Sequence, residues 1–329
     1  MFRAPKFRLA VLALVGCALA VYILERIGLK PILSAAAAVG WRGFTILCVY
    51  QLLLFVLLGT AWNVLIPASC GSRAPVFIWA RMVRDATSEL LPFSHLGGIV
   101  LSARTAMFHG VPRQVAIGSM VTDVTTEMLA QILFTAAGVG ILTTSTPHNS
   151  LTFSIASTAV LGLAAIVLSC SAFVAFQRYG QAFTTRLISR LFPSAASAAE
   201  SVAACIAEIY RRPANVCLSV LLHCGGWAAT ALSTWIALVL MGVDAHFWPV
   251  FAIESLVCAA RSMAFLVPSG LGVQEVAYAA IAPLFGIGAE IGLAISVLKR
   301  AREIAVGLPI LLLFQWTEGR NFLSYKVSA

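Results

Sequence analysis

Charged side chains inside long apolar segments are the residues of this sequence with the clearest chemical potential. Arg81, Asp85 and Glu89 follow one another at i, i+4 spacing, and Asp123 and Glu127 share that spacing, which places each set on one face of a helix. An ionisable group inside a lipid bilayer costs several kcal/mol unless it is paired or hydrated. If these segments cross a membrane, their charges are candidates for binding an ion or a polar ligand.

An internal ion pair is the simplest role for such charges. Arg81 with Asp85, and Lys299 with Glu303, have the spacing that lets opposite charges on one helix neutralise each other. A pair of this kind would orient helices and leave nothing for a ligand. The same spacing is equally compatible with a ligand site, so the sequence leaves both interpretations open.

Asp123 and Glu127 also admit two interpretations. They could relay protons or bind a cation that is coupled to transport. Alternatively, they pair with Arg84 or Arg104. The residues predicted to serve in coupling or ion pairing are Asp85, Asp123, Glu127, Lys299 and Glu303.

The second half of the chain has more cations than acids near its apolar segments. The cations are Arg261, Lys299, Arg300 and Arg302, and the acids weighed against them are Glu275 and Glu303. Guanidinium groups and helix N-termini both favour phosphate and other anions. A surplus of positive charge here therefore favours an anionic head group as the ligand.

Residues 263–278 contain the break in helical structure that would position these charges. An apolar segment ends at Pro268, Gly270 and Gly272 follow, and helix-forming sequence resumes before Glu275. Proline removes a backbone donor, and glycine permits tight turns. Irregular backbone at membrane depth survives only where it is buried in protein or lines a wet cavity. The break predicts a re-entrant hairpin at a site, with a simple kinked helix as the alternative.

A second break of the same kind lies earlier in the chain. Pro92 precedes Pro268 by 176 positions, and Gly97 and Gly98 supply the glycines of its turn. In both copies a short helix, a glycine turn and a long helix with a glutamate near its middle follow the break. This order indicates an internal duplication, which is how many transporters are built.

Composition indicates the class of protein. Of the 329 residues, 60% are hydrophobic and 11% are charged, a balance typical of polytopic membrane proteins. Despite a net charge of +9, no basic-aromatic surface indicates nucleic-acid binding. The eight cysteines form no C-x-x-C pair, so neither a disulfide framework nor a zinc site is expected. No nucleotide, nucleophile-elbow or metalloprotease motif occurs, and no cofactor is expected.

We predict an all-α, polytopic membrane protein with about six full spans and two Pro/Gly-broken re-entrant helix pairs, arranged as inverted repeats. The full spans are 9–24, 44–66, 115–142, 153–176, 216–241 and 291–316, and the hairpins are 76–108 and 250–284. Residues 1–329 form one integral membrane domain, in which 44–143 is the first repeat, 214–316 the second, inverted repeat, and 177–213 a cytoplasmic connector with an amphipathic helix over 195–210.

The distribution of Lys and Arg predicts the orientation. With the N-terminus inside, the Arg-rich connector 177–213 and the C-terminal tail are also cytoplasmic, and the loops 143–150 and 242–249, without Lys or Arg, are outside. The basic connector 26–42 is an exception. One span between the repeats requires the second to be inverted. Hairpins made of two full spans each would leave these loop sides unchanged.

Several motifs resemble those of a known family. Val267–Glu275 resembles the Pro-Gly-Gly-Leu-Gly-x-x-Glu signature of the flippase-like membrane domain of lysylphosphatidylglycerol synthases, with Ser269 where that family often has glycine. Leu91–Gly98, Lys299–Glu303 and Gln315–Gly319 resemble, more narrowly, the hopanoid-biosynthesis-associated membrane protein of type L. The resemblance covers about residues 5–320. It implies a bacterial inner-membrane protein that moves a lipid or its head group between leaflets. Aminoacylation, which belongs to the cytosolic domain of those synthases, is not expected.

We therefore predict a lipid-flippase-like transporter, not an enzyme, that moves a hopanoid or an anionic lipid between the leaflets. An intramembrane enzyme acting on a polyprenyl or triterpenoid lipid, and a non-transporting scaffold of a lipid-synthesis complex, are the alternatives. The expected partners are the bilayer and a membrane lipid, with a homo-oligomer or lipid-biosynthesis proteins as further options. The predicted substrate-binding residues are Arg84, Glu89, Pro92, Gly97, Gly98, Arg261, Pro268, Gly270, Gly272, Glu275, Arg300 and Arg302.

Overall fold

The computed structural model describes residues 29–67, 70–71, 73–91, 95–145, 196–263 and 272–327, together with isolated residues between 157 and 172. Every regular element among them is a helix, which confirms the all-α prediction. The predicted span 9–24, most of 153–176, and the turn residues Pro92, Pro268 and Gly270 lie outside the described residues.

The helices follow the predicted order. They are α2 (Leu29–Ala38), α3 (Gly40–Asn63), α4 (Ala74–Leu90), α5 (His95–Phe108), α6 (Arg113–Ser145), α9 (Ala196–Tyr210), α10 (Pro213–Leu240), α11 (Phe247–Met263), α12 (Val273–Ile281), the 3-10 helix η4 (Ala282–Phe285) and α13 (Ala289–Val327). Most ends agree with the predicted segments to within a few residues, but α13 continues to Val327. The amphipathic helix predicted over 195–210 is α9.

The predicted connector 26–42 contains a helix of its own. Leu29–Ala38 forms α2, and α3 begins at Gly40, earlier than the predicted start of the span at 44. α2 packs against α13, where Ala36 contacts the buried pair Leu293 and Ala294.

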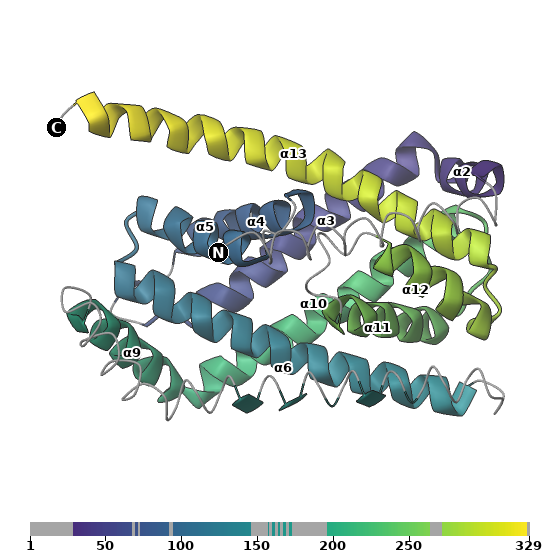
Figure 1. The fold of residues 1–329 in the computed structure, drawn as a ribbon, viewed down its shortest axis with the longest axis horizontal. Coiled ribbons are helices and arrows are strands. Elements are labelled where there is room, and N and C mark those ends of the chain that lie inside the picture. Colours follow the sequence, from purple (N-terminus) through teal and green to yellow (C-terminus); the bar gives the residue numbers. More distant parts are fainter. Residues whose placement is uncertain are drawn as a thin grey trace, which may run out of the picture.

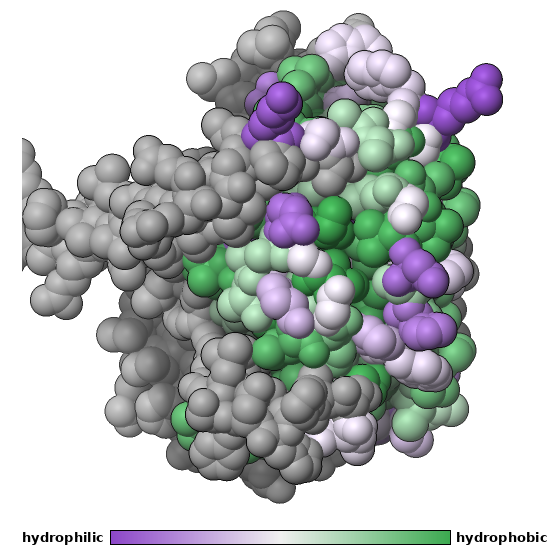
Figure 2. Space-filling view, turned by 90° about the vertical axis from the view of Figure 1, so that its right-hand side faces the viewer, coloured by the Kyte–Doolittle hydropathy of each residue, from purple (hydrophilic) through white to green (hydrophobic). Residues whose placement is uncertain are grey.

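Among the described residues, three helices are long and apolar enough to cross a membrane: Gly40–Asn63, Arg113–Thr144 and Pro213–Leu240. α13 has 39 residues, but its first half carries the charges of Lys299, Arg300, Arg302 and Glu303. Large apolar side chains such as Leu53, Leu133 and Leu312 are more than half exposed on the outer surface, as expected where lipid is the solvent. Apolar side chains also cover much of the end face seen in Figure 2, between scattered hydrophilic ones.

The order of elements occurs twice. A long helix (α3 or α10), a 17-residue helix (α4 or α11), a short helix (α5, or α12 with η4) and a second long helix (α6 or α13) follow one another in each half. Figure 1 shows α6 and α13 along opposite long edges, running in opposite directions. In that view α4 and α5 lie toward one end of the molecule, and α11 and α12 toward the other.

Local chemistry explains where the short helices begin and end. The backbone becomes extended at Leu91, which ends α4, and α5 packs back on α4. Gly272 has φ +80°, a conformation that glycine adopts at little cost, and α12 starts directly after it. The Gly272 N–H donates to Glu275 Oε2 over 2.8 Å, so this glutamate caps the helix. Gly286, also with positive φ, ends η4.

Two main hydrophobic clusters lie side by side along the molecule. The first joins α3, α4, α5, α6 and α9 and includes Trp62 and Phe77, with the Trp62 indole N–H donating to Ser119 Oγ over 3.0 Å. The second joins α6, α10, α11, α12 and α13 and includes Tyr278 and Ile253. Because α6 belongs to both, it connects the two halves of the helical frame.

Candidate functional site

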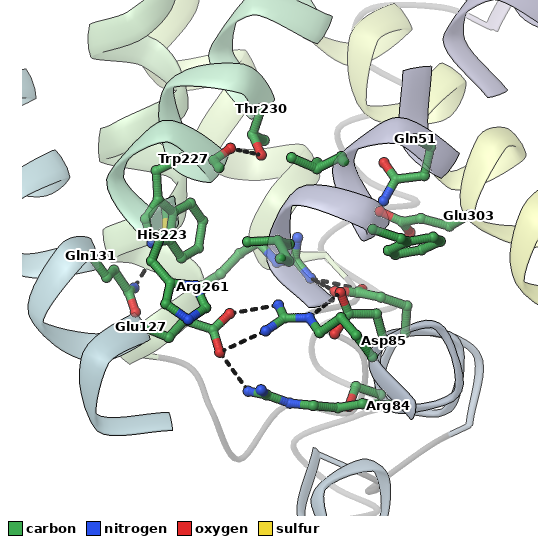
Figure 3. Close-up of a pocket in the computed structure, with 18 of the residues that line it drawn as sticks. Gln51, Arg84, Asp85, Glu127, Gln131, His223, Trp227, Thr230, Arg261 and Glu303 are labelled. Atoms are coloured by element: carbon green, nitrogen blue, oxygen red, sulfur yellow. Dashed lines mark hydrogen bonds and ion pairs between the residues drawn. The ribbon is translucent and has the colours of Figure 1, made fainter. Parts of the chain in front are cut away.

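A cavity of about 630 Å³ lies between the two halves. Side chains of eight helices line it, α3 to α6 from the first half and α10 to α13 from the second. Its apolar wall includes Phe55, Phe134 and Trp227, and Figure 3 shows charged side chains converging on the same space. The charged lining residues are Arg81, Arg84, Asp85, Glu89, Glu127, Glu254, Arg261, Lys299, Arg302 and Glu303. A pocket of this size with an apolar wall and a few charged groups suits a small polar ligand or head group.

The most complete ion-pair cluster is the α4–α6 network. Its members are Arg81, Arg84, Asp85, Asp123, Glu127 and His223. Glu127 receives hydrogen bonds from both guanidinium groups, at 2.7 Å from Arg81 Nη2 and 2.6 Å from Arg84 Nη2. Figure 3 shows this convergence of α4 cations on α6. The pairing holds α4 firmly against α6.

The remaining bonds of this network satisfy its buried acids. Arg81 Nε donates to Asp85 over 3.0 Å, and Arg84 Nη1 donates to Asp123 over 3.1 Å. Asp123 is fully buried, and its second oxygen lies 3.0 Å from His223 Nε2 of α10. Each carboxylate therefore has a cationic or imidazole partner, as burial of charge demands.

A second cluster, the α11–α13 network, surrounds Glu254. Lys299 Nζ donates to Glu254 over 2.6 Å and to the Tyr278 hydroxyl over 2.9 Å. Thr234 donates to the same carboxylate over 2.7 Å, and the Tyr278 hydroxyl also bonds it. Four helices, α10 to α13, thus meet at one glutamate whose side chain is only 4% exposed.

An ion pair connects α4 to α11. Arg261, near the end of α11, donates to Glu89, near the end of α4, over 2.8 Å and 3.0 Å. Both side chains are about a quarter exposed, and both line the cavity. Each of these residues lies in the last turn of its helix, so the pair holds the ends of α4 and α11 together at the cavity.

Arg300 and Arg302 differ in their partners. Arg300 lies 3.5 Å from both Glu275 and Glu303. Arg302 donates to the hydroxyl of Ser233 over 3.0 Å. Among the residues that the structure describes, Arg302 has no carboxylate within ion-pair distance, although it is 7% exposed and its Nε lacks a hydrogen-bond partner.

The predicted site residues are only partly gathered at the cavity. Those that line it are Arg84, Asp85, Glu89, Glu127, Arg261, Lys299, Arg302 and Glu303. Gly97, Gly98, Asp123, Gly272, Glu275 and Arg300 are described but do not line it. Gly98 instead permits the close packing of α5 on α4, since an added Cβ would lie 2.6 Å from the Arg84 carbonyl oxygen. The positions of Pro92, Pro268 and Gly270 are outside the described residues.

The structure decides two pairings that the sequence left open and corrects the predicted cation surplus. Lys299 does not pair with Glu303, because the more deeply buried Glu254 of α11 takes that ammonium group. Arg104, the second of the two candidate partners for Asp123 and Glu127, lies at the surface, 3.6 Å from Glu318. The predicted surplus of cations in the second half of the chain largely disappears, because Glu89 and Glu254 neutralise Arg261 and Lys299.

Two other pairing expectations were correct. Arg81 and Asp85 form the predicted i, i+4 pair at 3.0 Å. Arg84 pairs with both Asp123 and Glu127, which is one of the two interpretations that the sequence left open for these acids. Pairing of this completeness makes the α4–α6 network a structural unit of the cavity wall.

Sequence analysis missed Glu254, Tyr278 and His223 as members of the site. Glu254 carried the clearest signal, because an acid inside an apolar segment requires a partner on a facing helix. Tyr278 and His223 carried none, since both types are common in packed helices. Among the described residues, no group of three or more His, Cys, Asp or Glu side chains is arranged to hold a metal ion.

A multi-pass helical membrane protein, with a charged cavity enclosed between its two halves, is the class that the fold and the site define. The family model of the lysylphosphatidylglycerol synthase TM region matches residues 8–310, and the chain belongs to this family. Comparison with curated proteins gives no match, and neither does comparison with solved structures.

Proposed function

We propose that the protein transfers a lipid with an anionic head group between the two leaflets of the bacterial inner membrane. The head group would occupy the cavity while the apolar tails remain in the surrounding lipid. The family supports a flippase-like membrane protein, and the cavity offers a polar site within an apolar frame. No chemical step on the lipid is part of the proposal.

The environment of the Arg302 guanidinium group is the main support for this proposal. Five cations line the cavity within the described residues, and four of them have a carboxylate within 4.0 Å. Arg302 bonds to the neutral hydroxyl of Ser233 and has no acid within that distance among the described residues. A buried guanidinium without an acid is costly, and a phosphate or carboxylate would supply the missing charge with bidentate geometry. The ligand that best fits the site is therefore anionic.

The arrangement of the helices supports a transport role. We infer that the two halves are inverted repeats, with about six full spans, two re-entrant helix pairs and both termini in the cytoplasm. Transporters of this plan place their substrate site near the bilayer midplane, at the interface between the repeats. The cavity lies at that interface, lined by both halves.

A hopanoid is the second cargo to test, since the sequence motifs resemble a hopanoid-associated family. Its polar part need not carry a negative charge, so Arg302 would contribute less to its binding. An anionic phospholipid, by contrast, would form a charge-assisted hydrogen bond of about 1.5–3 kcal/mol with Arg302. The dependence of each cargo on Arg302 therefore distinguishes them.

Exchange between leaflets in proteoliposomes tests the proposal. The rate would be measured for labelled phosphatidylglycerol, phosphatidylcholine and a hopanoid, with wild type, Arg302→Ala and Arg302→Lys. Arg302→Ala should slow protein-dependent exchange of phosphatidylglycerol roughly tenfold to a hundredfold, as the lost bond predicts. Arg302→Lys should retain part of the rate because it keeps the charge.

Arg104→Ala is the matched control, since Arg104 is 45% exposed in its side chain and lies outside the cavity lining. It should leave the exchange rate unchanged. If no lipid exchanges faster than in protein-free liposomes, transport of these lipids is excluded and a scaffold role gains support. Equal loss with Arg302→Ala for the neutral and the anionic lipids would contradict the assignment of Arg302 to an anionic head group.

A further inference from the structure

Glu303 is a cavity acid that is held by a longer ion pair than its counterpart Glu127 on α6. It lies 176 positions after Glu127, at the equivalent place in the second long helix. Glu127 is bonded by two guanidinium groups at 2.6–3.2 Å. The ion pair recorded for Glu303, within the described residues, is a longer one of 3.5 Å to Arg300. Arg300 divides that interaction with Glu275, at the same distance.

The other charged groups around Glu303 are bonded to other residues or carry the same charge as Glu303. Arg261 approaches from α11 but is bonded to Glu89 of α4. Glu89 itself adds a second negative charge beside Glu303. Arg302, the adjacent residue on α13, also acts on Glu303, but its hydrogen bond goes to Ser233.

The neutral lining residues complete this environment. Gln51 of α3 and Thr230 and Ser233 of α10 carry no charge, and Gln51 and Thr230 line the same cavity as Glu303. Figure 3 shows the Glu303 side chain beside Gln51 of α3, across the cavity from Glu127 and His223. A carboxylate that is 13% exposed and weakly compensated becomes cheaper to bury when it takes up a proton.

We propose that Glu303 is the proton site of the transporter, and that it binds a proton when an anionic head group occupies the cavity at Arg302. This inference rests on the proposed function. An anion at Arg302 neutralises the cation beside Glu303 and adds negative charge, so it increases the affinity of Glu303 for a proton. By linkage, a proton on Glu303 strengthens binding of the anion equally.

The stoichiometry is simple. One proton enters the Glu303 carboxylate from water on one side of the membrane, together with one anionic lipid. The same proton returns to water on the other side when the lipid leaves. Lipid anion and proton together carry no net charge, so the loaded cavity avoids the cost of moving an unpaired charge through the bilayer. A proton gradient would then bias lipid distribution by about tenfold for each pH unit, since one proton accompanies each lipid.

Infrared difference spectroscopy of the purified full-length protein tests the proton site directly. Addition of short-chain phosphatidylglycerol should produce in wild type the C=O band of a protonated carboxyl group, which shifts in D₂O, whereas the ester C=O bands of the lipid do not. Glu303→Gln should lack this band, and Glu127→Gln should retain it because Glu127 is held as a carboxylate by two arginines. Glu303→Asp should keep the band at a shifted frequency, which assigns it even if Glu303→Gln does not fold. An unshifted band would overturn the assignment.

Lipid exchange under a pH gradient separates this inference from the proposed function. Wild-type proteoliposomes should accumulate labelled phosphatidylglycerol in the leaflet facing the higher pH. Glu303→Gln should lose that bias while it still exchanges lipid between leaflets. Exchange by wild type without any effect of the gradient would overturn proton coupling and leave transport intact. Absence of exchange would overturn the proposed function, whereas the infrared result would still decide whether Glu303 binds a proton.

Discussion

The two long helices α6 and α13 place charged side chains at equivalent positions but pair them very differently. In the α4–α6 network, Asp123 and Glu127 have guanidinium or imidazole partners at 2.6–3.1 Å. On α13, Lys299 is bonded to Glu254 at 2.6 Å. Among the described residues, Arg302 instead bonds to a neutral hydroxyl, and Glu303 has an ion pair of 3.5 Å. The same order of helices thus carries closely paired charges in the first half and more weakly paired charges in the second half, where a ligand could bind them.

The charges of α6 and α13 differ in pairing because different helices supply their ion-pair partners. α4 faces α6 with two arginines, Arg81 and Arg84, which match its two acids. α11 faces α13 with one acid and one cation, Glu254 and Arg261, and Arg261 is bonded across the cavity to α4. The opposite walls of the cavity therefore have different amounts of unsatisfied charge, although their helices have the same order.

Loss of an arginine from each wall should have opposite consequences for stability. Arg81→Met leaves Asp85 and Glu127 short of a buried partner, and removal of one member of a buried ion pair costs about 3–5 kcal/mol. Arg302→Met removes a cation that, among the described residues, has no carboxylate within ion-pair distance, so it should leave the free energy of unfolding nearly unchanged or increase it. Unfolding in mixed detergent micelles measures both.

A loss of similar size for both variants would contradict this account of the two walls. It would mean that Arg302 has a stabilising partner comparable to those of Arg81. Retention of helical circular dichroism before unfolding would show that each variant starts from a folded state.

The sequence could predict helices and their order, but not most of their partners. Hydrophobic segments and the Pro/Gly breaks locate α4, α5 and α11 to α13, because helix formation in a membrane depends on local composition. Spacing of i, i+4 identifies the ion pair of Arg81 with Asp85, but Lys299 pairs with Glu254 instead of Glu303. This spacing shows which side chains are neighbours on one helix. It does not show whether a buried acid on a facing helix binds the cation instead.

Partners far apart in the chain were the hardest to predict. Glu89 and Arg261 are 172 positions apart, and only the packing of α4 and α11 about one cavity brings them together. The positive charge predicted at the site from the second half of the chain alone is therefore too large, because Glu89 lies in the first half. Long-range pairing must be known before a surplus of charge can be assigned to a ligand.

Reversal of the pair that connects the two hairpins should have the second-largest effect on stability. Arg261→Glu places a carboxylate opposite Glu89 and near Glu303, and the repulsion should lower the free energy of unfolding by about 2–4 kcal/mol. The double variant Glu89→Arg, Arg261→Glu should recover at least half of that loss. A double-mutant cycle in mixed micelles measures the coupling energy, and additive effects would show that the two side chains do not interact.

The smallest predicted effect concerns the backbone contact that positions the α4 arginines. An alanine at Gly98 would place Cβ 2.6 Å from the carbonyl oxygen of Arg84, and backbone cannot rotate away as a side chain can. α5 must move off α4, which should cost about 1–3 kcal/mol in the free energy of unfolding, as overpacking does. Gly140→Ala is the matched control, because nothing lies within 4 Å of a Cβ there and alanine favours a helix over glycine by about 1 kcal/mol. Gly98→Ala should therefore destabilise and Gly140→Ala stabilise, and equal shifts would show that the close approach of α5 to α4 contributes little to the wall of the cavity.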